Sequence, residues 1–119
     1  MIVMKPRRVE LALALLVSSL AVVCIGDSAT AADLKAGRAK AMMCQACHGL
    51  DGVSKVPDAP NIAGQVEPYL VAQLQAFKSG ARKNDAMSVV APTLSDADIE
   101  NIAAYYAAIE VNVGKIPGE

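Results

Sequence analysis

The sequence predicts an all-α fold in which three main helices are joined by two long loops. Two observations support this class: apolar residues recur at helical spacing in three segments, and no segment shows the alternation of a strand or the turn of a hairpin. Residues 49–66 and 81–94 lack such a periodic pattern and are expected to form the loops. A chain of 119 residues has room for one domain of ordinary size.

The first helix is expected to begin after Asp33, a residue type suited to cap a helix N-terminus. Four residues that follow share one face at helical spacing: Leu34, Gly37, Ala41 and Cys44. A glycine inside a helix costs about 1 kcal/mol relative to alanine. Gly37 therefore indicates that another backbone or ring approaches this helix closely.

The second helix is expected to begin near Glu67, with Pro68 in the first turn, where a missing N–H does no harm, and to end at Gly80. The third opens at Ser95 with a capping box in which Asp98 replaces the usual Glu. Residues 111–119 are expected to be irregular. The apolar faces of these two helices consist of Leu70, Leu74, Phe77, Ile99, Ile102, Tyr106 and Ile109.

Residues 1–31 are predicted to be a cleaved signal peptide, which leaves 32–119 as a single mature domain. Positive charges within the first eight residues precede an apolar stretch at 11–25, and Ala29 and Ala31 provide the small residues of a cleavage site. The apolar stretch is shorter than the roughly 20 residues that span a bilayer, which favours cleavage over an uncleaved anchor. We expect the mature chain, cleaved near Ala31, in the periplasm and not anchored in a membrane.

The charge balance excludes nucleic acid as an expected partner. The chain has 11 Lys and Arg against 12 Asp and Glu, and no basic run or face stands out. Its apolar fraction is 54%, but aromatic residues make up only 3% and Trp is absent. A small domain with so little large apolar surface usually needs disulfides, a metal or a large cofactor to stabilise it.

The segment Cys44-Gln45-Ala46-Cys47-His48 is the attachment signature of c-type haem. Two thiols three residues apart can each add to one of the two vinyl groups on the same porphyrin edge. The adjacent His48, the one histidine of the chain, then places its imidazole under the iron as the proximal ligand. The motif predicts one covalent haem c, bound as thioethers of Cys44 and Cys47, and the haem attachment machinery as a partner during maturation.

Three other roles for this motif fit the sequence less well. A structural zinc site needs four ligands, and two Cys with one His leave it one short. A thioredoxin-type redox pair lies at a helix start in a βαβ unit, whereas here the pair falls at the end of a helix in a chain without strands. A disulfide that closes two intervening residues would stabilise little, because its loop is so short. Haem attachment is therefore the preferred interpretation, and a porphyrin would also fill the sparse core.

The sixth iron ligand follows by elimination. Two of the five methionines leave with the signal peptide, and Met42 and Met43 are too close to Cys44 to reach the far face of a haem. Met87 remains, in the second expected loop, where a thioether can be presented to a metal. A core-filling role for Met87, a lysine ligand and an open sixth position are the alternatives.

The sequence resembles the small class I cytochromes c, above all the bacterial single-haem members. These also look like one half of the two-haem periplasmic cytochromes. The likeness covers residues 33–109 and depends on several segments in order. They are Cys44 to Gly49, Pro60-Asn61-Ile62-Ala63-Gly64-Gln65, Tyr69-Leu70 with Gln73-Leu74, Phe77 to Arg82, Met87, Leu94 to Ile99, and Ala103-Ala104-Tyr105-Tyr106.

The resemblance implies the class I cytochrome c fold, with long loops wrapped around one covalently bound haem. It implies that the carbonyl of Pro60 accepts a hydrogen bond from Nδ1–H of His48 and orients the ring. It also implies that Gly37 receives the third helix near Tyr105. A weaker implication places Arg82 and Gln65 near the haem edge or propionates. The Ser-Val-Val-Ala-Pro segment after the distal methionine departs from relatives, which often have a glycine or second methionine there.

His/Met ligation with no open position predicts electron transfer and no substrate chemistry at iron. We expect a periplasmic one-electron carrier, not an enzyme, that exchanges electrons with redox protein partners acting as donor and acceptor. The alternative is a haem c subunit permanently docked to a periplasmic dehydrogenase or oxidase. A ligand-binding haem sensor is a third possibility that would require an open iron site.

Overall fold

The computed structural model describes residues 31–118, and every segment of regular structure within them is helical. The predicted all-α fold is thereby confirmed, whereas the predicted signal peptide lies outside the described residues except for Ala31. No helix within residues 31–118 is long and apolar enough to cross a bilayer. The elements are α1 (Leu34–Lys40), η1 (Ala41–Met43), α2 (Gln45–His48), α3 (Glu67–Ser79), α4 (Met87–Val90), η2 (Ala91–Thr93) and α5 (Asp96–Ala107).

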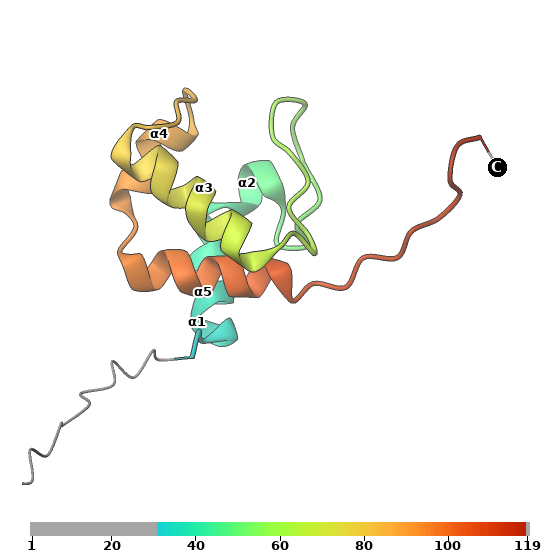
Figure 1. Ribbon diagram of the computed structural model, residues 1–119, viewed down its shortest axis with the longest axis horizontal. Helices are drawn as coiled ribbons and strands as arrows, with labels where there is room; N and C mark the ends of the chain where they lie inside the picture. Colours follow the sequence, from blue (N-terminus) through green and yellow to red (C-terminus); the bar gives the residue numbers. More distant parts are fainter. Residues whose placement is uncertain (1–30, 119) are drawn as a thin grey trace, which may run out of the picture.

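Helix α5 is the central element, because it packs against both α1 and α3 (Figure 1). Its N-terminus is the predicted capping box: Ser95 Oγ accepts from Asp98 N at 3.0 Å, and Asp98 Oδ2 accepts from Ser95 N at 2.9 Å. These bonds and the Lys40 ammonium, 3.2 Å away, hold the pKa of Asp98 below its usual value. The cap thus links the start of α5 to the end of α1.

Helix α1 begins, and helix α3 begins and ends, at residues that the sequence indicates. Asp33 caps α1 by accepting from the backbone N–H groups of Lys35 and Ala36 at 2.8 and 3.1 Å. Helix α3 has Pro68 in its first turn and ends at Gly80, which adopts a left-handed conformation with φ 79°. The loop at 49–66 contains no regular helix, as expected, and the tail after α5 is irregular.

The first expected helix is broken into three pieces, which corrects the prediction of one continuous helix ending at the motif. Helix α1 ends at Lys40, and the chain tightens through η1 because Cys44 N–H bonds Ala41 O, three residues back, at 2.9 Å. Helix α2 then starts at Gln45, with Cys44 as its N-cap residue. Leu34 is half exposed, so it lies off the buried face on which Gly37 and Ala41 lie.

The second expected loop contains the short helices α4 and η2, so the prediction of an irregular segment at 81–94 was wrong in this part. A turn at Asn84 leads into α4, because Asn84 Oδ1 accepts from the N–H groups of Ala86 and Met87 at 3.1 and 3.0 Å. Met87 is therefore the first residue of a helix instead of a residue in a free loop. Two helical turns this short leave too little apolar periodicity to be recognised in the sequence.

The α1–α5 crossing is centred on Gly37, which is buried. A Cβ at this position would overlap the carbonyl oxygen of Asn101 and lie 2.9 Å from Cβ of Tyr105. This confirms the predicted close approach of the third main helix and explains a glycine inside α1. Around the crossing lies a small core that consists of Ala41, Leu70, Leu94, Ile99, Ile102, Ala103 and Tyr106.

Replacing Gly37 by Ala is expected to lower the free energy of unfolding by about 1–3 kcal/mol, although alanine favours helices, because backbone of α5 occupies the space of the new methyl group. Chemical denaturation of the haem-loaded protein followed by circular dichroism measures the change. Gly114→Ala is the matched control, since nothing lies within 4 Å of a Cβ there. Equal stability of the two variants would contradict the tight crossing.

Candidate functional site

The two cysteines of the motif lie at and just after the start of helix α2. Cys44 is the N-cap residue, Cys47 lies in the helix, and both are half-buried free thiols, so the structure does not contain the disulfide considered above. Burial, and to a lesser extent the neighbouring Cys47, raises the pKa of the Cys44 thiol to about 11. Within residues 31–118 no group of three or more His, Cys, Asp or Glu side chains is arranged to hold a metal ion.

His48 ends helix α2 and is buried, with 8% of its surface exposed. Its Nδ1 lies 2.9 Å from the carbonyl oxygen of Pro60. A carbonyl can only accept, so Nδ1 donates its proton and Nε2 is left as the lone-pair nitrogen. The contact that the resemblance implies is therefore present, and it fixes the tautomer in which Nε2 can bind a metal.

A second set of contacts lies beside the motif and is not predicted from the sequence. The hydroxyl of Tyr106 donates to the carbonyl of Gly49 at 2.9 Å, and that of Tyr105 donates to the carbonyl of Leu50 at 2.7 Å. Burial raises the pKa of Tyr106 above its ordinary value, so this phenol stays a neutral donor. A signal existed, because a tyrosine on the buried face of a helix needs a partner for its hydroxyl. The sequence could not show which carbonyl it would meet.

The remaining predicted site residues lie on α3, α4 and the segments beside them. Met87 is half-buried at the start of α4, which packs on α3. The Arg82 guanidinium lies 4.6 Å from the centroid of the Phe77 ring, and its Nη1 donates to Gln73 Oε1. Gln65 Oε1 accepts from Val66 N at 2.9 Å. The roles of Met87, Arg82 and Gln65 at a haem stay predictions.

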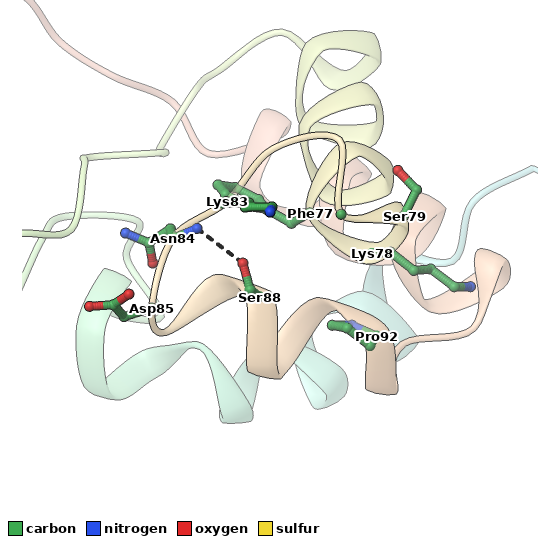
Figure 2. A pocket seen from close by; sticks show the side chains of 9 residues that line it. Phe77, Lys78, Ser79, Lys83, Asn84, Asp85, Ser88 and Pro92 are labelled. Carbon is green, nitrogen blue, oxygen red and sulfur yellow. Dashed lines mark hydrogen bonds between the residues drawn. The ribbon is translucent and has the colours of Figure 1, made fainter.

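A surface hollow of about 520 Å³ lies between the end of α3 and α4 (Figure 2). Six of the nine residues that line it have polar or charged side chains, and Asn84 N donates to Ser88 Oγ at 3.0 Å across one side. Neither cysteine of the motif nor His48 contributes to its wall. The hollow is therefore not formed by the cysteine pair or by His48.

The donor set and the packing both fit a haem attached to α2. Two free thiols three residues apart are followed by a histidine whose Nε2 is available, as covalent attachment and proximal ligation require. Only Tyr106 and Ile99 stand out as large side chains that are fully buried among the described residues. A core this small leaves a large apolar cofactor a structural role.

The fold and the donor set thus define an all-α haem-binding protein. Residues 34–108 match the model of the family described as Cytochrome c. The chain belongs to this family, and its single Cys-x-x-Cys-His motif fits one covalently bound haem c.

Two curated relatives show the extent of the similarity. Cytochrome c4 of Pseudomonas aeruginosa is 46% identical over 89 residues, which is 75% of this chain and 44% of the relative. Cytochrome c-554(548) of Halomonas halodenitrificans is 42% identical over 83 residues, which is 67% of this chain and 100% of that protein. The chain spans about half the length of the cytochromes c4 that it matches.

Two solved structures are similar in fold as well as in sequence. Reduced cytochrome c4 from Pseudomonas stutzeri has a TM-score of 0.64 and 43% identity, with 71% of this chain and 49% of that chain covered. Thiosulfate dehydrogenase from Marichromatium purpuratum has a TM-score of 0.61 and 36% identity, with 66% of this chain and 20% of that chain covered. These matches confirm the class I cytochrome c fold.

A chain that cannot hold haem is expected to be largely unfolded, because its own core is small. The triple variant Cys44→Ser/Cys47→Ser/His48→Ala removes both attachment points and the candidate proximal ligand at once. Its far-ultraviolet circular dichroism should show little helix and no cooperative thermal transition, in contrast to the haem-loaded parent. A helical spectrum that melts cooperatively would show that the polypeptide folds without the cofactor.

Proposed function

We propose that the chain is a periplasmic one-electron carrier in which Cys44 and Cys47 hold the haem covalently, His48 is the proximal ligand and Met87 the distal ligand. The observation that carries the proposal is the orientation of His48. Its Nδ1 is bound to the Pro60 carbonyl at 2.9 Å, which leaves Nε2 for the iron. A free histidine on a mobile loop would need no such support, whereas an iron ligand almost always has it.

The bound haem supplies reversible uptake and release of one electron. The residues around the haem keep the iron ligands in place while the electron is exchanged. His48 is held by a backbone carbonyl instead of a titratable side chain, so no proton has to move at Nδ1 when the charge of the site changes. A thioether from Met87 favours the reduced state relative to a second histidine. Redox proteins are the proposed donor and acceptor.

The proposed location depends on residues 1–31, which carry the features of a cleaved signal peptide. Covalent haem attachment outside the cytoplasm agrees with this location. The mature chain is proposed to begin near Ala32 and to diffuse freely, and the haem attachment machinery acts on it after export. Arg82 and Gln65 are proposed to lie near the haem edge, Arg82 with its guanidinium supported by Phe77 and Gln73.

Met87→Ala is expected to abolish the weak long-wavelength absorption band that iron–sulfur ligation gives the oxidised protein, and to lower the reduction potential, because the thioether ligand is lost. Absorption spectra of the oxidised variant and a redox titration measure both changes. Met42→Ala is the matched control, since Met42 is half exposed beside the motif. Persistence of the band in Met87→Ala, or its loss in Met42→Ala, would contradict the assignment.

A haem subunit of a dehydrogenase is the second candidate function, favoured by the similarity to thiosulfate dehydrogenase from Marichromatium purpuratum. A curated thiosulfate dehydrogenase electron acceptor of Stutzerimonas stutzeri is also 41% identical over 75 residues. Size-exclusion chromatography of the protein from its native periplasm separates the two functions. A carrier elutes as a free small protein, whereas a subunit elutes in a stoichiometric complex with a catalytic chain.

A further inference from the structure

Tyr106 contacts both ends of the loop that carries Pro60. Its hydroxyl donates to the carbonyl of Gly49, directly after His48, at 2.9 Å. Its backbone carbonyl accepts from the N–H of Gly64 at 2.9 Å. One residue of α5 therefore fixes the points at which the chain leaves the haem motif and returns to the body of the protein.

Tyr105 adds a third contact to the same region, because its hydroxyl donates to the carbonyl of Leu50 at 2.7 Å. We call Tyr105 and Tyr106, with their bonds to Gly49, Leu50 and Gly64, the tyrosine clamp. The two rings meet edge to face, with centroids 5.1 Å apart and planes at 62°.

Bonds inside the loop connect the clamped ends to Pro60. The carbonyl of Gly52 accepts from the N–H groups of Ile62 and Ala63 at 2.8 and 3.1 Å, so the outgoing and returning backbones lie side by side. Farther out, Ser54 N donates to Asn61 Oδ1 at 2.7 Å. The position of the Pro60 carbonyl is therefore set by a closed network whose base is held by the clamp.

The helix that carries the clamp is itself held rigidly. Tyr106 is fully buried, and the α1–α5 crossing places Gly37 against Asn101 and Tyr105. At the same crossing, Asn101 Oδ1 accepts from Asp33 N at 2.7 Å. A displacement of the loop base thus requires either breaking the clamp or moving α5 from α1.

We propose that Tyr106, assisted by Tyr105, is a positioning residue that holds the Pro60 carbonyl against Nδ1 of His48 and thereby tunes the reduction potential. This inference rests on the proposed function, because it takes His48 as the iron ligand. The hydrogen bond from Nδ1 makes the ring a stronger electron donor and favours the oxidised state. Loosening the loop lengthens that bond and raises the potential.

Tyr106→Phe keeps the ring and removes only the hydroxyl, which makes it the main test. In the haem-loaded variant we expect the redox equilibrium constant to shift towards the reduced form by about two- to fivefold, the effect of weakening one hydrogen bond. Amide hydrogen exchange at residues 61–64, measured in the same sample, is expected to accelerate. Tyr105→Phe should change both quantities in the same direction but less, because it leaves both bonds of Tyr106 in place.

Tyr69→Phe is the matched control, since Tyr69 is half exposed on α3 and its hydroxyl bonds no residue within the described part of the chain. It should leave the potential and the exchange rates unchanged. An unchanged potential together with unchanged exchange at 61–64 in Tyr106→Phe would overturn the proposal. If that variant does not load haem, Tyr105→Phe decides by the same two measurements.

Failure of the clamp and failure of the proposed function give different results. If the clamp has no role, the parent remains a low-spin haem protein and the Tyr106→Phe and Tyr105→Phe variants match it in potential. If His48 is not the ligand, His48→Ala retains the spectrum of the parent. Loss of stability in Tyr106→Phe without any change in potential would assign Tyr106 a packing role only and would also overturn the proposal.

Discussion

The contact of α1 with α5 at Gly37 is the constraint on which the rest of the structure depends. Because no side chain separates the helices there, the backbone of α5 reaches α1, and the following turn of α5 carries Tyr105 and Tyr106 to the segment after the motif. Those tyrosines bond the carbonyls of Gly49 and Leu50. The crossing therefore determines where the loop with Pro60 begins and how the imidazole of His48 is held.

The candidate haem site and the hydrophobic core depend on each other. The described part of the polypeptide supplies few large side chains that are fully buried. A covalently attached porphyrin contributes apolar surface that alanine-rich helices cannot. We therefore expect the cofactor that gives the protein its redox chemistry also to complete the core of a chain with 3% aromatic residues.

Many of the helix ends and the main helix contact could be predicted from local sequence signals. The caps at Asp33 and Ser95, the stop at Gly80 and the close approach at Gly37 depend on backbone rules that act over a few residues, and the structure follows them. The break after Lys40 and the short helix that begins at Met87 were not predicted, because a single helical turn leaves no periodic pattern of apolar residues. The hydroxyl bonds of the tyrosine clamp were not predicted, because the carbonyls that accept them lie 55 and 57 residues away along the chain.

Covalent attachment of one haem through the motif on α2 can be tested by measuring the intact mass of the exported protein. We expect a single species after denaturation, with the mass of residues 32–119 plus one haem, and loss of the added mass in the Cys44→Ser/Cys47→Ser variant. A denatured parent with the mass of the bare polypeptide would contradict covalent attachment, and retention of residues 1–31 would contradict the proposed processing.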